Sequence, residues 1–430
     1  MMYQAKLALR SLLYRKKQYV SLFLVCMFGV AVSLAAIAVS TGMMRSLRQK
    51  ARIYYGGDFA LMCSDKDASL EIYDYEEKCD VVRAVLPPDA VVTPRMVFDG
   101  RDGLFYFEGV QAFMQTVMGI NIENESSLLS SFFFVEGGVA EMVGHRNGVL
   151  ISAPVARMLG VHVGDEITFQ LETTGGFVNT VQIEVRGIFQ DSSVFGTYTS
   201  YMDFDFLKAA RGYPENYANR ICVNFPGRKV TERNLHEFYD SLRSVLNMYR
   251  WVDDKRDFIS ARNSIAVETW GFIPLSANLS EVEIMELAMD AVITFIIIIL
   301  AVIIIAGIGS TYRVLIMKRI TEIGVYMAVG MKKRSIAGAL LLEAFALLLV
   351  GCLGGIVLAD LFCSVLSVFD FSFIPSFDMF LESGNLCPRP DVIKSVAVIV
   401  SVIVATLLAV LYAAMQSIKI MPVEALAVTE

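Results

Sequence analysis

One acidic residue, Glu343, lies where a carboxylate needs a chemical explanation. It is placed about two turns inside the long apolar run Ile336–Ala359. A charged side chain within such a run is costly to transfer into a bilayer, so it marks a functional site or is paired with another group. We favour the second interpretation, in which Glu343 reaches the cytoplasmic interface or bonds within a helix bundle. Glu343 is still the residue to consider first as an intramembrane polar site.

Other patterns that could do chemistry are missing. The chain has no G-x-x-x-x-G-K-[ST] sequence, so it cannot bind ATP through a P-loop. His145, His162 and His236 fit no metal motif, and Ser152 lacks the G-x-S-x-G context of a nucleophile. We therefore expect no catalytic residue, no metal and no cofactor in this chain, which is not itself an enzyme.

The seven cysteines follow neither a metal spacing nor a C-x-x-C pattern. Cys26, Cys352 and Cys363 lie in or beside apolar runs, where cysteine is usually a small core residue. The other four lie in polar segments, and the sequence does not say whether they pair; they are Cys63, Cys79, Cys222 and Cys387.

Composition indicates a membrane protein with a large aqueous part. The 430 residues are 55% hydrophobic with a mean hydropathy of +0.54, which is too apolar for an ordinary soluble protein. A charged content of 19% is too high for a wholly embedded chain. The net charge of −7 argues against nucleic acid as a partner.

Four apolar runs are each long enough to cross a bilayer as a helix. The predicted spans are 18–44, 286–312 (a stalk followed by the second span), 336–359 and 392–415. Around them we expect a cytoplasmic interfacial helix at 1–17, a cytoplasmic loop at 313–335, an outer loop at 360–391 and a cytoplasmic tail at 416–430. The fold class is thus a four-span helical bundle with an α+β domain inserted between spans 1 and 2.

That domain covers residues 45–285 and mixes strand and helix patterns. We expect a lower lobe from about 45–120 and 215–280, and an inserted lobe from about 121–214. Asp99-Gly100 and Asp102-Gly103 predict a hairpin turn between strands 95–98 and 104–107. Strands are also expected at 148–152, 166–171 and 180–187, with a short helix at 153–159 that Gly160 ends. Thr231 is expected to cap a further helix.

The helix of the second span is expected to begin outside the membrane. Ser280 and Glu283 have the spacing of a capping box, and no Gly or Ser follows before the apolar run 291–312. A single helix would then join the domain rigidly to the membrane, whereas a flexible linker would need such residues.

Loop charge predicts the orientation. The N-terminal segment and the loop 313–334 are rich in Lys and Arg, whereas Arg389 is the only such residue at 360–391. The positive-inside rule then places both termini in the cytoplasm and the domain outside, in a multi-pass protein of the cell membrane. Arg45, Arg48, Lys50 and Arg52 disagree, but long translocated domains follow the rule poorly.

The central segment 318–334 is expected to form a helix of about three turns. One stripe of it is apolar or small, comprising Ile320, Ile323, Gly324, Met327, Ala328 and Met331. Gly330 lies where a left-handed residue would end the helix, and Lys332, Lys333 and Arg334 follow. The segment either rests on the bilayer surface or docks into a partner protein, with Gly324 and Ala328 permitting close approach.

Small residues also recur within two spans. Gly351 and Gly355 form a G-x-x-x-G pair, which lets a second helix approach closely. Ser401, Ala405, Ala409 and Ala413 form a ridge on the fourth span. We expect Gly351, Gly355, Ala405 and Ala409 to be helix-packing residues.

The order of these motifs resembles the FtsX/MacB-type permeases of ABC transporters. The central loop carries Arg319-x-x-Glu322-Ile323-Gly324 and then Ala328-x-Gly330, with Glu343-Ala344 beyond it. The opening run 7–12 and the closing run 422–426 are also similar to that family, as is the block 148–189 to the MacB-type outer domain.

The resemblance implies a permease that works with a separate cytoplasmic ABC ATPase and a second permease copy or paralogue in the lipid membrane. The ATPase-coupling residues would be Arg319, Glu322, Ile323, Gly324, Ala328 and Gly330. Such proteins move the outer domain to expel peptides, antibiotics or lipoproteins, which makes efflux by mechanotransmission the expected function. The alternative is a non-transporting signalling protein that regulates a cell-envelope hydrolase or senses an extracellular ligand.

Overall fold

The computed structural model describes residues 16–67, 69–193, 195–374, 377–382 and 384–417. The interfacial helix expected at 1–17 and the tail expected at 416–430 lie almost wholly outside these residues. The chain divides into two compact units. The helical unit contains residues up to 43, 287–369 and from 386 onwards, and the α+β domain contains 44–286 and 370–385.

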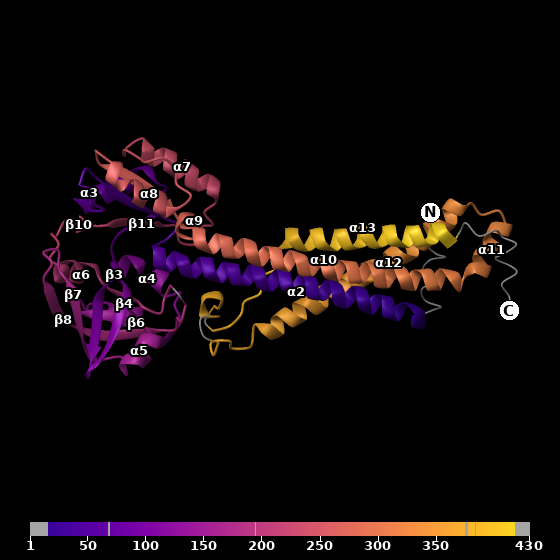
Figure 1. The fold of residues 1–430 in the computed structure, drawn as a ribbon, viewed down its shortest axis with the longest axis horizontal. Helices are drawn as coiled ribbons and strands as arrows, with labels where there is room; N and C mark the ends of the chain where they lie inside the picture. The colour runs from indigo at the N-terminus through magenta and orange to yellow at the C-terminus, as the bar shows by residue number, and fades with distance from the viewer. Residues whose placement is uncertain (1–15, 68, 194, 375–376, 383, 418–430) are drawn as a thin grey trace. The chain divides into compact units, whose positions relative to one another are not determined.

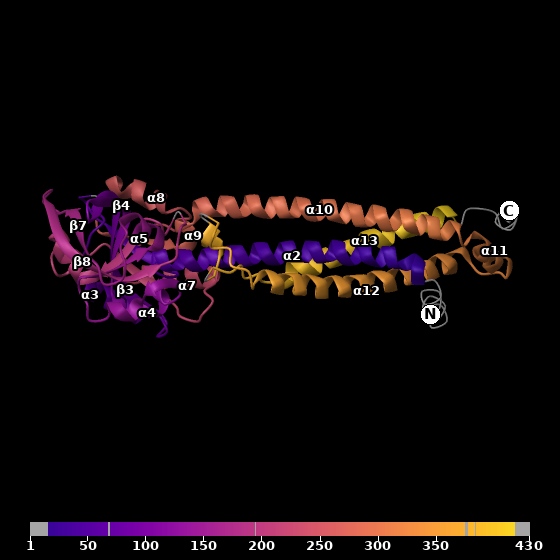
Figure 2. The ribbon, with the colours of Figure 1, turned by 90° about the horizontal axis from the view of Figure 1, so that it is seen from below.

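Four long helices supply the helical unit, and two of them continue into the α+β domain. They are α2 (Lys16–Tyr55), α10 (Ser280–Met317), α12 (Lys333–Leu366) and α13 (Val392–Ser417), with the short α11 (Ile320–Ala328) between α10 and α12. Each long helix is apolar enough and long enough to cross a membrane. Both ribbon views show them side by side in the helical unit (Figures 1 and 2).

Two of these helices extend beyond their apolar runs. α10 runs from Ser280 through the acidic residue Asp290 without a break, as the sequence predicts, whereas the continuation of α2 past Met44 to Tyr55 was not predicted. The side chains of 280–285 lie outside the described ones, so the expected capping box at Ser280 and Glu283 has no structural account. Apolar periodicity locates the membrane-embedded part of a helix and not its polar continuation.

The α+β domain is built on one sheet whose strands partly close on themselves. Its path runs β12-β1-β11-β3-β4-β9-β6-β8-β5, and β7 pairs with both β3 and β8. Strands β3, β4, β9, β6, β8 and β7 therefore form a closed ring. The bounds are β1 (Phe59–Ser64), β3 (Val91–Phe107), β4 (Val110–Ile120), β5 (Phe134–Gly137), β6 (Gly148–Ser152), β7 (Glu166–Glu172), β8 (Val178–Phe189), β9 (Thr199–Asp203), β11 (Arg220–Asn224) and β12 (Thr269–Pro274), with a separate pair β2 (Ile72–Tyr73) and β10 (Tyr217–Ala218).

Short helices cover this sheet. They are α3 (Tyr75–Val85), α4 (Ile122–Leu129), α5 (Ala153–Leu159), α6 (Phe204–Arg211), α7 (Glu232–Arg243), α8 (Lys255–Ala261) and α9 (Leu275–Asn278), with 3-10 turns η1 (Val139–Met142), η2 (Arg262–Ser264) and η3 (Phe377–Phe380). The main core of the domain lies between α3, α5, α6 and α7 and the sheet. Its rings include Phe105 and Phe169, which pack edge to face.

Several local predictions in this domain are confirmed. β6, α5 and the antiparallel pair β7–β8 lie where the sequence places them. Gly160 ends α5 with a φ of 74°, a left-handed conformation that favours glycine. Thr231 caps α7 in a capping box with Asn234.

The hairpin predicted at residues 95–107 is wrong. Residues 91–107 form the single strand β3, and the register with β4 shifts between Asp99 and Gly103. The turn lies further along, at Glu108 and Gly109, which have φ of 46° and 86°. Pairing of β3 with β11 on one side of the shift and with β7 on the other extends the strand through it. Because distant strands pair with β3 on both sides, the residues that locally favour a turn form a β-bulge within one strand.

Candidate coupling site

The central segment forms a helix that is closed at both ends by backbone geometry. Arg319 is the N-cap of α11, and Gly330 follows its last turn with a φ of 91°. The N–H of Gly330 donates to the carbonyl of Met327 at 3.0 Å, and the N–H of Met331 donates to Tyr326 at 3.0 Å. This left-handed ending turns the chain, so that α12 can begin at Lys333.

One face of α11 packs on the helical unit itself. Ile320, Ile323 and Gly324 are buried, and Met327 and Met331 pack against the same apolar core. The core also contains residues of α2, α10, α12 and α13. The first part of the expected docking stripe, including Gly324, is therefore covered by the chain's own helices and is not open to a partner.

The opposite face of α11 is exposed. Glu322, Val325, Tyr326 and Val329 lie on it, and Val329 is 83% exposed. Their spacing of i, i+3, i+4 and i+7 places them on one side of the helix. We call these four residues the outer face of α11. Ala328 and Gly330 are exposed beside it.

A buried polar cluster holds the beginning of α11. The Arg319 guanidinium donates through Nη1 to Oε2 of Glu343 at 2.9 Å, and the Tyr19 hydroxyl donates to Oε1 of the same carboxylate. The side chains of Arg319 and Glu343 are only 8% and 4% exposed. The cluster joins α11 to α12 and to α2, which agrees with the interpretation that Glu343 bonds within the bundle.

Tyr312 of α10 lies beside this cluster. Its side chain is fully buried, and its hydroxyl has no hydrogen-bond partner among the described residues. A buried hydroxyl without a partner costs about 1–3 kcal/mol.

The small residues of the spans lie at helix contacts. A Cβ at Gly351 would come within 2.9 Å of the Cys26 sulfur, and one at Gly355 within 2.9 Å of Val30 Cβ, so α12 approaches α2 closely. α10 also approaches α13 closely, because a Cβ added at Gly309 of α10 would lie 3.6 Å from the Cβ of Ala409 on α13. Ala405 and Ala409 are half-buried, beside the buried ridge Val402, Thr406 and Val410.

Three groups that hold the fold together were missed from the sequence. Tyr19 is a lone polar group near the start of an apolar run, which is a usable signal for a bundle contact. Asp378 lies among apolar residues, Phe377, Met379 and Phe380, in a loop that otherwise reads as simply acidic. Arg95 gave no signal, because its partner Glu125 is distant in the chain and in a different element.

The remaining candidates form no reactive site. No disulfide joins any of the seven cysteines, and no group of His, Cys, Asp or Glu among the described residues has the arrangement of a metal site. His145 contacts Arg186, His162 contacts Glu136, and His236 stacks on Trp251 with ring centroids 3.9 Å apart. These are ordinary surface and packing contacts.

Comparison with known families assigns both parts of the chain. Residues 294–422 match the FtsX-like permease C-terminal family, and residues 23–232 match the MacB-like periplasmic core domain. The first range runs from within α10 through α11, α12 and α13, and the second runs from within α2 through most of the α+β domain. None of the curated proteins matches the chain.

Two solved structures are similar to part of the chain. The periplasmic region of MacB from Actinobacillus actinomycetemcomitans is 8% identical, with a TM-score of 0.33, over 54% of this chain and 95% of that one. A domain described as a permease protein from Porphyromonas gingivalis is 11% identical, with a TM-score of 0.28, over 44% of this chain and 84% of that one.

Proposed function

Because the chain belongs to the FtsX/MacB-type permeases and is an ABC-transporter permease, we propose that a separate cytoplasmic ATPase drives it. The observation that carries this proposal is the pair of family matches, one on each part of the chain. The chain has no P-loop of its own, so ATP hydrolysis falls to a partner. Two permease chains, as a homodimer or with a paralogue, complete the transporter.

The proposed orientation has both termini and α11 in the cytoplasm and the α+β domain outside. It is supported by the basic residues that follow α11, namely Lys332, Lys333 and Arg334. The outer loop 360–391 carries few such residues. In this orientation the four long helices are the membrane spans, and the α+β domain is inserted between the first two.

The outer face of α11 is the proposed contact with the ATPase. It combines an apolar patch, Val325, Tyr326 and Val329, with the acid Glu322. Because Gly324 and Ile323 face the bundle, they position the helix and do not touch the ATPase. Arg319 likewise acts within the chain. The coupling residues expected from the sequence thus divide into an inner set, which holds α11, and an outer set, which meets the partner.

Movement of α11 reaches the spans through the Arg319–Glu343–Tyr19 cluster. Arg319 lies at the N-cap of α11, Glu343 on α12 and Tyr19 on α2. A displacement of the N-cap therefore acts on two spans at once through charge-assisted hydrogen bonds, which are stronger than neutral ones. From α2 the movement continues along a single helix as far as Tyr55.

We propose that the α+β domain responds as two lobes that share the sheet. In the sheet order, β12, β1, β11, β3 and β4 come from residues 45–120 and 215–280, and β9, β6, β8 and β5 come from 121–214. The two sets meet where β4 pairs in parallel with β9 and where β3 pairs antiparallel with β7, which also comes from 121–214. Such a transporter would expel peptides, antibiotics or lipoprotein-like molecules that the domain contacts outside the membrane.

The ATPase contact is tested by substitution on the outer face of α11. Val329→Asp places a charge in the apolar patch and should reduce the amount of ATPase that co-purifies with the permease by at least about tenfold. Val267→Asp is the matched control, because Val267 is also a strongly exposed valine but lies in the α+β domain. Equal recovery of the ATPase with both variants would overturn the proposed contact.

Orientation is tested separately with an impermeant thiol reagent in intact cells. A cysteine at Val267 should react before lysis, whereas one at Ser335 should react only after lysis. Reaction of the Ser335 cysteine in intact cells would reverse the orientation and remove the ATPase contact with it.

A further inference from the structure

The loop between α12 and α13 does not simply return the chain to the membrane. Its residues 370–385 belong to the α+β domain and not to the helical unit. Within it, Asp378 is 2% exposed and Leu381 is 1% exposed. A buried carboxylate in a short loop needs several hydrogen bonds to offset its lost hydration.

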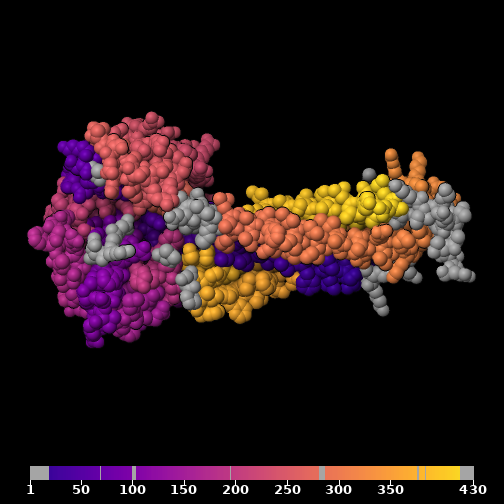
Figure 3. Space-filling view, in the orientation of Figure 1, coloured from indigo at the N-terminus to yellow at the C-terminus, as the bar shows by residue number. Residues whose placement is uncertain are grey.

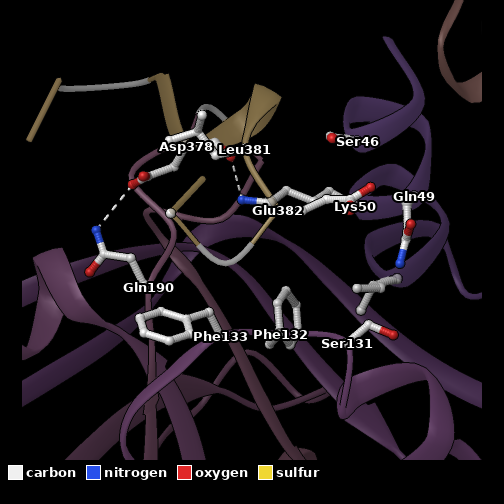
Figure 4. A pocket seen from close by; sticks show the side chains of 12 residues that line it. Ser46, Gln49, Lys50, Ser131, Phe132, Phe133, Gln190, Asp378, Leu381 and Glu382 are labelled. Carbon is white, nitrogen blue, oxygen red and sulfur yellow. Dashed lines mark hydrogen bonds between the residues drawn. The ribbon is translucent and has the colours of Figure 1, made fainter. Parts of the chain in front are cut away.

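Asp378 has these hydrogen bonds, and all of them come from one segment of the domain. Its Oδ2 accepts from Gln190 Nε2 at 3.1 Å, from the Ser192 N–H at 3.1 Å and from the Ser192 hydroxyl at 2.6 Å. Figure 4 shows the bond from Gln190 together with a second bond, which Lys50 donates to the Asp378 carbonyl at 2.5 Å.

The same segment also holds the end of α2. The carboxylate of Asp191 is fully buried, accepts from the Tyr54 hydroxyl at 2.6 Å and lies 3.8 Å from Lys50 Nζ. Lys50 and Tyr54 belong to α2, inside the α+β domain. Residues 190–193 are therefore attached to α2 through Asp191 and to the α12–α13 loop through Asp378. We call this arrangement the Asp191 junction.

A pocket of about 150 Å³ lies beside the junction, between α2 and the loop. Ser46, Gln49 and Lys50 line one side, and Asp378, Leu381 and Glu382 line another (Figure 4). The pocket thus lies directly beside the hydrogen bonds that Asp378 accepts.

We propose that Asp378 is the positioning residue that fastens the α12–α13 loop to the domain, so that spans 3 and 4 have their own attachment to it. The domain is then connected to all four spans: to α2 and α10 through the chain and to α12 and α13 through Asp378. A displacement of α12 and α13 would then displace residues 190–193 through Asp378. Asp191 would transmit that displacement to α2. This inference concerns contacts within one chain and does not depend on the ATPase.

The test measures the reactivity of a cysteine placed at Leu381 in the purified full-length chain. The parent chain with its native cysteines gives the baseline, and Val178→Cys, on a 67% exposed position, gives the rate of a free thiol. Leu381→Cys alone should add no rapid reaction. Adding Asp378→Ala should make it react at least about tenfold faster, because the loop loses its charge-assisted bonds.

Two further variants separate a role of the carboxylate from general damage. Asp370→Ala removes another loop carboxylate, one that accepts from Ser372 within the loop, and should leave the Leu381 cysteine protected. Asp378→Asn keeps one carbonyl oxygen that can accept, so the reaction rate should fall below that of Asp378→Ala. Where Asp378→Ala fails to fold, Ser192→Ala, which removes the 2.6 Å bond, should give a smaller increase in the same direction.

Two results would overturn the proposal. Rapid reaction of Leu381→Cys without any other change would show that the loop is not fastened. Continued protection in the Asp378→Ala or Ser192→Ala background would show that Asp378 does not hold it. Neither result bears on the ATPase contact, because the measurement needs no partner, nucleotide or membrane orientation.

Discussion

A buried arginine–glutamate pair occurs in each unit of the molecule, and each pair is bonded to α2. In the α+β domain, Arg95 and Glu125 are 0% and 4% exposed, and Arg95 donates through Nη1 to the carbonyls of Ile53 and Tyr54 at the end of α2. In the helical unit, Arg319 and Glu343 are bonded to Tyr19 near the beginning of α2.

Several hydrogen bonds hold the pair in the α+β domain. Arg95 makes two bonds through Nε to Glu125, at 3.1 and 2.9 Å, and Thr93 donates to the same carboxylate at 3.1 Å. Although burial lowers the pKa of Arg95, the adjacent Glu125 carboxylate raises it well above its ordinary value. The helix end also places partial negative charge against the guanidinium. Arg95 therefore stays charged and fixes the end of α2.

The pair at Arg319 has a different setting. Arg319 is the N-cap of α11, and its partner Glu343 lies on α12. The pair at Arg95 lies on a central strand, β3, between β11 and β4. The proposal thus gives the same chemistry two roles, a fixed anchor on a sheet in one unit and a joint between helices in the other.

The largest expected effect is the loss of the anchor. Arg95→Met leaves Glu125 buried without its cation and removes the bonds to the α2 carbonyls of Ile53 and Tyr54, of which Ile53 also accepts from the Gly56 N–H. It should lower the free energy of unfolding of the α+β domain by about 3–5 kcal/mol. Denaturant unfolding followed by tryptophan fluorescence measures this, because the buried Trp270 reports on the domain core.

The control for this prediction is Arg83→Met, at an exposed pair with Asp80. It should change the same free energy by less than about 1 kcal/mol. Equal losses for Arg95→Met and Arg83→Met would show that the buried pair is not an anchor, and the contrast between the two buried pairs would disappear.

A double substitution sharpens the comparison between anchor and joint. Replacing both members of a buried pair by apolar residues of similar volume is often neutral for stability. Arg319→Met with Glu343→Met should therefore cost less than about 2 kcal/mol, most of it from the Tyr19 hydroxyl that loses its acceptor. Arg95→Met with Glu125→Met should stay more destabilised, because the α2 carbonyls lose the bonds from Arg95 and the Thr93 hydroxyl loses its acceptor.

The double variant at the joint also has a functional expectation. The ATPase should still co-purify, because the outer face of α11 is unchanged, but ATP should no longer alter the reactivity of cysteines in the α+β domain. If ATP still alters it, the Arg319–Glu343 pair is structural only and the joint lies elsewhere.

How much of this the sequence predicts depends on the range of the contact. The spans, the left-handed Gly330 and the short elements from Gly148 to Gly160 follow from local periodicity and turn chemistry, and they are present. The bonding of Glu343 within the bundle also followed from the cost of a charge in an apolar run. Its partner did not, because Arg319 reaches it only through the reversal at Gly330.

Distant elements compete for residues that carry local signals. The hairpin at Asp99–Gly103 is wrong for this reason, and part of the stripe around Gly324, whose docking role stays a prediction, is buried in the helical unit. β3 extends through the turn because β7 and β11 pair with it, and the stripe of α11 is buried because the span core takes it. Asp378 was counted only as loop charge because its donors lie far away, at 190–192.

The smallest expected effect on the free energy of unfolding comes from a pair on the surface, with which the two buried pairs can be compared. Lys78 Nζ lies 3.0 Å from Glu268, and Trp270 Nε1 donates to the same carboxylate oxygen at 2.9 Å. Burial raises the pKa of Glu268, but the bonds from Lys78 and Trp270 outweigh it and bring the pKa below its ordinary value. The Glu268 side chain is 52% exposed, so the pair should contribute about 0.2–1 kcal/mol.

The sign of the pH dependence follows from that direction. The folded state holds the Glu268 proton less tightly than the unfolded state, so the contribution is present above the unfolded pKa of about 4.3. It is lost as the pH falls through the lower folded pKa. Glu268→Gln should therefore cost a few tenths of a kcal/mol at pH 7 and flatten the loss of stability below about pH 4.3. A Glu268→Gln cost as large as that of Arg95→Met would mean that exposure does not separate these pairs, and the distinction between anchor, joint and surface pair would fail.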